Sequence, residues 1–253
     1  MSYQFESDGL QLVGRLARPE RIPSGGVPGL VICHGFPTRS NGVADPGRSY
    51  YDLAERMAED MGWMALAFTY RGCGESEGDF SLGGWLSDVL NAVEHLHARD
   101  DVNDVWVAGF GTGGALAIAA AARTDKVRGV AAVSPPADFN DWIEEPDGLL
   151  AYARKVGAID NPEFPEDVDA WKAELSDISA NKAASKIGET PLLIMHGAED
   201  DVVSVFDARV IADAHGSADL RIIAGGGHRL RFDPRAIAVF LGWLERCRTN
   251  AAV

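Results

Sequence analysis

Short apolar runs that alternate with amphipathic segments constrain the fold of this chain more than any other feature. The runs are apolar at successive positions, as in strands that are covered on both faces. Six runs have this character: 29–33, 64–70, 105–108, 130–133, 191–195 and 220–224. Strands separated by helices are typical of a parallel sheet with right-handed crossovers. We therefore predict an α/β fold with a mostly parallel, twisted sheet flanked by helices.

The segments between these runs have apolar residues on one face, as surface helices do. Five helices are predicted in this way: 50–61, 82–98, 113–122, 206–215 and 235–247. Before the first run, apolar and polar residues alternate on both sides of Asp8-Gly9. This pattern predicts an antiparallel hairpin at the start of the chain.

A long interval without a strand interrupts the alternation between Pro135 and Pro191. Within it, 149–156 and 168–175 have helical periodicity. We predict a single domain over 1–253 with a small helical cap inserted at about residues 140–186. Such a cap would lie over the carboxyl ends of the strands, where open α/β folds bind their ligands.

Composition narrows the choice of partners. The formal net charge of -15 opposes nucleic acid and anionic membranes, so we expect a small-molecule ligand. Three scattered cysteines without a C-x-x-C pair disfavour a disulfide framework and a metal site, and no cofactor is expected. The first residues resemble no secretory signal, so we expect a cytoplasmic protein. An exposed edge at the last strand and helix is compatible with a homodimer.

A glycine-rich turn joins the run at 105–108 to the helix at 113–122. Gly109, Gly111 and Gly114 have the G-x-G-x-x-G spacing of a phosphate-binding turn. The unit lies in the middle of the chain, however, and no acidic residue follows a strand about 20 residues later to bind a ribose. We therefore disfavour a dinucleotide site. Small residues also suit a sharp turn from a strand into a closely packed helix.

Gly109-Phe110-Gly111-Thr112-Gly113 resembles the G-x-S-x-G nucleophile elbow of the α/β-hydrolase superfamily, with Gly111 at the nucleophile position. Four more segments resemble motifs of this superfamily in the same order: HGFP at 34–37, RGCGESEG at 71–78, HGAEDDVV at 196–203 and GGGH at 225–228. The resemblance covers nearly the whole chain and is strongest to the serine aminopeptidase-like and short-chain esterase-like branch. It implies the α/β-hydrolase fold.

The resemblance also implies roles for individual residues. His228 would be the base and Asp200 the acid of the catalytic triad. The backbone amides of Phe36 and Thr112 would form the oxyanion site. Two other carboxylates are alternatives for the acid: Asp138 and Asp201.

Four further residues are expected to border the substrate: His34, Gly35, Cys73 and Trp142. A structural alternative stands beside two of these assignments. His34, like His196, precedes a glycine at a strand end and suits a structural hydrogen bond. Trp142 suits packing of the cap as well as a pocket wall.

Acyl transfer in this fold needs an oxygen or sulfur at the elbow, and Gly111, whether natural or an engineered replacement of serine, has neither. Thr112 should begin a helix and Cys73 should be a small buried residue, so neither is a good replacement. We expect an enzyme that acts on a small carbonyl or ester-type compound through Asp200 and His228, without an acyl-serine. The alternative is a non-catalytic ligand-binding or regulatory pseudo-hydrolase.

A fluorophosphonate probe should therefore fail to label the chain. Labelling requires a nucleophilic oxygen or sulfur activated by a neighbouring base, and the elbow offers none. Mass spectrometry of the intact protein measures the adduct. An adduct on Thr112 or Cys73 would instead establish a displaced nucleophile.

Overall fold

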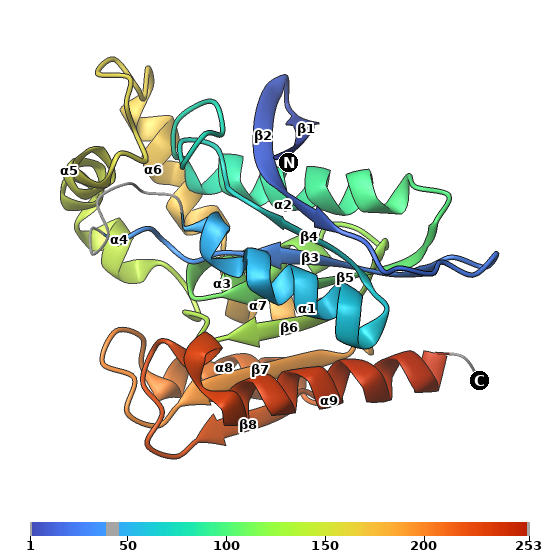
Figure 1. The fold of residues 1–253 in the computed structure, drawn as a ribbon. Coiled ribbons are helices and arrows are strands. Elements are labelled where there is room, and N and C mark those ends of the chain that lie inside the picture. Colours follow the sequence, from blue (N-terminus) through green and yellow to red (C-terminus); the bar gives the residue numbers. More distant parts are fainter. Residues whose placement is uncertain (1, 39–45, 252–253) are drawn as a thin grey trace.

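One eight-stranded sheet organises the fold in the computed structural model, which describes residues 2–38 and 46–251. The strands are β1 (Tyr3–Ser7), β2 (Leu10–Ala17), β3 (Val27–Cys33), β4 (Met64–Phe68), β5 (Val102–Phe110), β6 (Val127–Val133), β7 (Leu192–Gly197) and β8 (Asp219–Ile223). Their order in the sheet is β1-β2-β4-β3-β5-β6-β7-β8. The strands from β4 to β8 in this order are parallel, and β2 is antiparallel to both β1 and β4 (Figure 1). The predicted α/β-hydrolase fold is confirmed.

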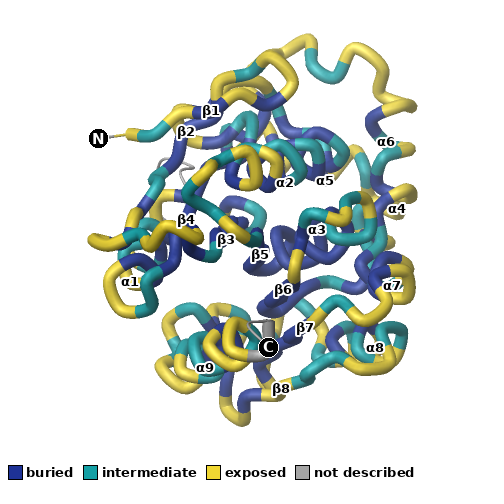
Figure 2. The backbone as a smooth tube through the Cα atoms, turned by 90° about the vertical axis from the view of Figure 1, so that its right-hand side faces the viewer, coloured by how far each residue is buried: buried dark blue, intermediate teal, exposed yellow. Residues whose placement is uncertain are grey.

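Helices cover both faces of this sheet. One face carries α1 (Tyr51–Met61) and α9 (Pro234–Ala251), and the other carries α2 (Leu82–His97), α3 (Thr112–Ala121) and α8 (Val205–His215), as Figure 2 shows end-on. Successive residues of β3 enter different cores: Leu30 and Ile32 pack with α1 and α9, and Val31 and Cys33 pack with α2 and α3. Because both faces are covered, the strands are apolar at successive positions.

The hairpin at the start of the chain has the predicted form. Asp8 and Gly9 form its two-residue turn, with φ of 51° and 82°, and Ser7 pairs with Leu10. Positive φ at both turn residues is typical of the type I′ turn, whose twist matches that of the strands.

The interval between β6 and β7 contains α4 (Asn140–Glu144), α5 (Pro146–Val156), α6 (Val168–Asp177) and α7 (Ala180–Ala184). Here α4 contacts both α5 and α6, and α6 also contacts α2. In contrast, α7 packs against α3 and α8 and so belongs to the layer of helices on the sheet. Within the predicted cap of residues 140–186, α4 to α6 thus lie together and α7 lies with the helices on the sheet.

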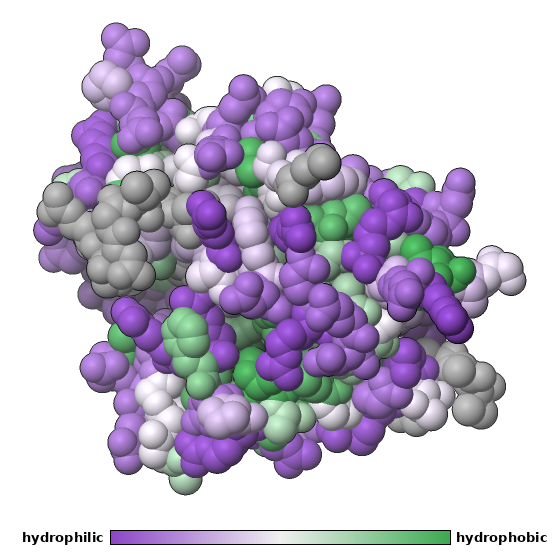
Figure 3. Space-filling model, in the orientation of Figure 1, coloured by the Kyte–Doolittle hydropathy of each residue, from purple (hydrophilic) through white to green (hydrophobic). Residues whose placement is uncertain are grey.

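The outer surface over α1 and α9 is mostly hydrophilic, with small and separate hydrophobic areas (Figure 3). Within residues 2–38 and 46–251, no helix combines the length and the apolar character that crossing a membrane requires.

The closest backbone contact near the elbow joins β5 to α3. A Cβ atom on Gly109 would lie 2.1 Å from the carbonyl oxygen of Gly113. A Cβ atom on Gly113 would lie 2.3 Å from the carbonyl oxygen of His34 and 2.7 Å from that of Cys33. Glycine at both positions therefore lets the first turn of α3 rest directly on β3 and β5.

Gly113→Ala should lower the free energy of unfolding by about 1–3 kcal/mol, because the added methyl group overlaps backbone atoms that cannot move aside. Gly148→Ala in α5 is the matched control. Among the described residues, the atom nearest its added Cβ is Glu145 Cβ at 3.8 Å, and alanine favours a helix, so stability should stay unchanged or rise. Urea denaturation followed by circular dichroism compares the two. An equal loss in both variants would contradict this account of the packing.

Candidate active site

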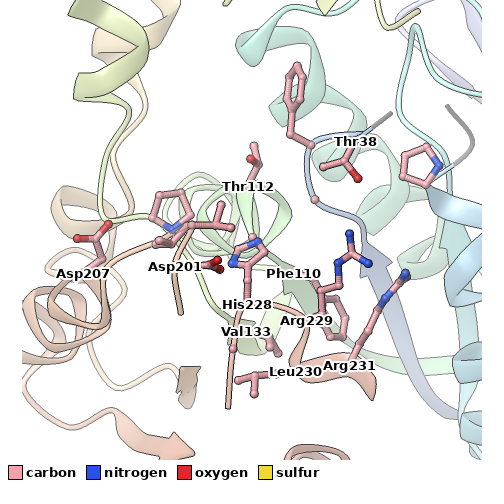
Figure 4. Close-up of a pocket in the computed structure, with 18 of the residues that line it drawn as sticks. Thr38, Phe110, Thr112, Val133, Asp201, Asp207, His228, Arg229, Leu230 and Arg231 are labelled. Atoms are coloured by element: carbon pink, nitrogen blue, oxygen red, sulfur yellow. The ribbon is translucent and has the colours of Figure 1, made fainter. Parts of the chain in front are cut away.

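The motif segments meet at the carboxyl ends of the parallel strands. Gly35 follows β3, Gly111 follows β5, Asp200 follows β7 and His228 follows β8. A cavity of about 1720 Å³ opens at this edge, and Gly35, Gly111 and His228 line it. Figure 4 shows His228 among the side chains of this cavity. Open α/β sheets bind their ligands at this edge.

Asp200 and His228 form a hydrogen-bonded pair. The Nδ1 atom of His228 lies 3.0 Å from Oδ2 and 3.2 Å from Oδ1 of Asp200. The carboxylate has no exposed side-chain surface and also accepts hydrogen bonds from the amides of Val202 and Val203. Because a carboxylate faces Nδ1, the proton of a neutral imidazole belongs there, and Nε2 carries the lone pair that accepts a proton.

Electrostatics keeps the Asp200 carboxyl ionised. Burial alone would raise its pKa, but the hydrogen bonds from Val203, Val202 and His228 outweigh burial and hold the pKa below its ordinary value. The loops that carry the pair are also joined, since the amide of Glu199 donates to the carbonyl oxygen of Gly226 over 2.9 Å. The pair is therefore positioned by backbone as well as by side chains.

A second histidine, His196, supports the same carboxylate. Its Nε2 atom lies 3.2 Å from Oδ2 of Asp200 and 3.0 Å from the carbonyl oxygen of Val203. The imidazole is fully buried at the end of β7. Its place is that of a structural hydrogen-bonding residue behind the acid.

The backbone at Gly111 has the geometry of a nucleophile elbow. Its φ and ψ are 55° and -126°, in a region that L side chains rarely adopt. A Cβ atom on Gly111 would lie 3.5 Å from Nε2 of His228 and 3.7 Å from the Cα of Gly35, which are ordinary contacts. A side chain at this position would therefore point at the proton acceptor, within the reach of one further bond.

The two amides assigned to the oxyanion site lie at the edge of the cavity. Thr112 is the first residue of α3, where helical amides have no partner within the helix. Phe36 lies in the loop after β3, and both residues line the cavity. Among the described residues, neither amide donates a hydrogen bond to protein, and the Thr112 hydroxyl is not bonded to His228. Two donors thus stay available beside the base.

The other carboxylates weighed as the acid have different surroundings. Asp138 and Asp201 both line the cavity, and neither is hydrogen-bonded to His228 in the part of the chain that the structure describes. Asp138 instead accepts from the amide of Asn140 over 3.1 Å.

His34 and Cys73, expected beside the substrate, are instead fully buried and do not line the cavity. His34 donates from Nδ1 to the carbonyl oxygen of Gly35 over 2.7 Å and accepts at Nε2 from the amide of Tyr70 over 3.1 Å. It therefore fastens the loop after β3 to the end of β4, and neither residue can contact a ligand in the cavity.

Aromatic residues make the wall on the cap side. Trp142 lines the cavity, and its ring centroid lies 5.2 Å from that of Phe36 and 4.9 Å from that of Phe139. Tyr152 of α5 lines the same wall. Trp142 thus packs against neighbouring aromatic residues and also borders the cavity, so its side chain has both of the predicted roles.

Arg229 and Arg231 also line the cavity, directly after the base, and no motif singles them out. The signal that could have found them is a pair of cations next to His228 in a strongly acidic chain. Within the described ranges, no cluster of three or more histidine, cysteine, aspartate or glutamate side chains could hold a metal ion.

Comparison with known proteins identifies the family of this chain. The family model of the alpha/beta hydrolase family matches residues 30–240. The chain belongs to this family. The mitochondrial palmitoyl-protein thioesterase ABHD10 of Homo sapiens is 25% identical over 218 residues, which cover 81% of this chain and 68% of the relative. That of Pongo abelii is also 25% identical, with 64% of its length covered.

Solved structures share the fold over nearly the whole chain. Est1E from Butyrivibrio proteoclasticus with ferulic acid bound has a TM-score of 0.73 at 24% identity, covering 99% of this chain and 100% of its own. The alpha/beta hydrolase GrgF from Penicillium sp. sh18 has a TM-score of 0.76 at 20% identity, covering 100% and 99%. At these identities the likeness shows the fold alone.

The burial of His34 predicts a pH dependence of stability. Burial disfavours the imidazolium and lowers the pKa of His34 from its ordinary 6.5 to about 4, although the bond to Gly35 opposes this. Between these values the unfolded chain binds the proton and the folded chain does not, so stability rises with pH across this window. The free energy of unfolding should therefore change less with pH in His34→Gln, by about 3 kcal/mol across this window.

Urea denaturation at a series of pH values measures this slope. His97→Gln, which changes an exposed histidine, is the control and should keep the wild-type dependence. A His34→Gln profile parallel to that of the wild type would contradict the role given to burial.

Proposed function

We propose that this member of the alpha/beta hydrolase family acts on a small carbonyl or ester-type compound, with Asp200 and His228 as its acid–base pair and no acyl-serine. One observation carries the proposal. Asp200 orients His228 so that its Nε2 atom faces the position above Gly111. A Cβ atom on Gly111 would lie 3.5 Å from Nε2, so Nε2 can accept a proton from a nucleophile at this position. The names of the ABHD10 relatives, which are thioesterases, support an ester or thioester bond as the target.

In hydrolysis, a water molecule above Gly111 takes the part of the serine oxygen. Its proton moves to Nε2 of His228 as its oxygen bonds to the carbonyl carbon, and the carbonyl electron pair moves onto oxygen. The amides of Phe36 and Thr112 donate to this oxyanion. When the tetrahedral adduct collapses, the leaving oxygen or sulfur takes the proton back from Nε2, and Asp200 remains ionised throughout.

The alternative function is ligand binding without turnover. The observation that favours it is Gly111 itself, since a binding protein loses nothing when a nucleophile is absent. The cavity and its aromatic wall would serve a ligand equally well. The two functions differ in whether His228 matters for rate.

We also propose a cytoplasmic location. Its support is the small number of cysteines, which form no disulfide in the described ranges. The mitochondrial location in the name of the relatives belongs to those proteins.

Turnover of para-nitrophenyl butyrate and of a butyryl thioester tests the proposal. We expect a rate above that of buffer, reduced about a hundredfold or more in His228→Ala, because general base catalysis is lost. Gly111→Ser should make the chain reactive with fluorophosphonate, since its side chain would point at Nε2.

His97→Gln again serves as the control and should keep the wild-type rate. If wild type and His228→Ala are both indistinguishable from buffer while Gly111→Ser reacts, the chain is a binding protein with an intact but unused acid–base pair.

A further inference from the structure

Two arginines form one end of the cavity beside the base. Arg229 precedes the short 3-10 helix η3 (Leu230–Phe232), and Arg231 lies within it. Both line the cavity. Figure 4 shows both guanidinium groups extending toward Thr38, on the side of His228 away from Asp207. A ligand at His228 would therefore have these two cations on one side.

Arg231 is held in place by uncharged groups. It donates to the hydroxyl of Ser49, and its guanidinium carbon lies 4.6 Å from the ring centroid of Tyr50 and 4.3 Å from that of Phe232. Contacts with aromatic faces fix a guanidinium and leave its donors able to bind an anion. In the part of the chain that the structure describes, no carboxylate is paired with Arg231.

Arg229 is exposed, and among residues 2–38 and 46–251 its guanidinium has no hydrogen-bond or ion-pair partner. Its neighbour Arg235, which also lines the cavity, differs because it is paired with Asp233 over 2.6 Å. In a chain of net charge -15, carboxylates are abundant. Arg229 and Arg231 therefore stand out, because both face the cavity and neither is paired with a carboxylate among the described residues.

Five carboxylates line the cavity: Asp138, Asp141, Asp201, Asp207 and Asp233. Asp233, close after Arg231 in the chain, is paired with Arg235, which also lines the cavity, so this ion pair adds no net charge. Asp207 accepts from the amide of Ala137, and it lies across His228 from the arginines in Figure 4. The cavity is thus polarised, and an anionic group would be repelled from one end and attracted to the other.

We propose that Arg229 and Arg231 form a subsite for an anionic oxygen group of the ligand, a carboxylate or a phosphate, while its carbonyl lies at His228. The planar guanidinium matches both groups with paired N–H donors. The place of the ligand's carbonyl at His228 rests on the proposed function. Binding of the anion itself requires no turnover, so the two can fail separately.

Isothermal titration calorimetry with three probes tests the subsite: phenylbutyrate, its neutral amide, and phenylpropyl phosphate. Wild type should bind at least one anion about tenfold more tightly than the amide, as expected for charge-assisted hydrogen bonds. The tighter of the two anions identifies the group. Added NaCl should reduce this preference.

Variants assign the preference to its residues. Arg229→Gln should weaken it, and the double variant with Arg231→Gln should abolish it. Arg209→Gln is the matched control, because Arg209 lies in α8 against Phe206 and does not line the cavity. His228→Ala should keep the preference, which separates the subsite from the oxyanion site and from catalysis.

Two results would overturn the proposal. One is equal binding of the amide and both anions by wild type. The other is an anion preference that survives in the double variant, which would place the anion at the amides of the oxyanion site. Arg229 is exposed, so the single Arg229→Gln variant decides the question even if the double variant fails to fold. A chain inactive on esters that still prefers the anion would refute the proposed function alone.

Discussion

The close backbone packing of β5, the turn at Gly111 and the first turn of α3 is the constraint on which the site depends. Gly109 and Gly113 allow it, since a side chain at either position would meet a carbonyl oxygen at 2.1–2.3 Å. The packing presents the Thr112 amide to the cavity. This geometry owes nothing to the side chain of residue 111. Glycine at position 111 is therefore compatible with His228 and the Thr112 amide in their observed places.

Close backbone packing also positions Asp200 and His228. A Cβ atom on Gly197 would lie 2.2 Å from the carbonyl oxygen of Gly226, so the loops after β7 and β8 are in direct backbone contact. Asp200 is further held by two amides and by His196. A buried carboxylate with so many donors remains an anion and orients His228 without changing its own protonation. The two ends of the cavity differ in charge. This difference bears on which ligand binds more than on the proton transfer at His228.

The sequence predicts the sheet and the pairing of acid with base well, because both follow from simple constraints. A strand covered on both faces must be apolar at successive positions, and the parallel strands carry their loops to one edge. Asp200 and His228 are found from their order after the elbow. The burial of His34 and Cys73 matches the structural alternatives predicted for them rather than a place beside the substrate. A residue just beyond a strand has no periodicity that decides between core and cavity. The same limit hides Arg229 and Arg231, which flank Leu230 in a turn of three residues.

The backbone of Gly111, with φ of 55° and ψ of -126°, bears on how such a site evolves. Any other residue there is strained by about 1–3 kcal/mol. Enzymes with a nucleophile at this position are less stable by that amount, in exchange for activity. Glycine adopts these angles without that strain. A lineage that replaced its nucleophile with glycine would have gained tolerance for other destabilising mutations. That tolerance would extend to substitutions in the walls of the cavity.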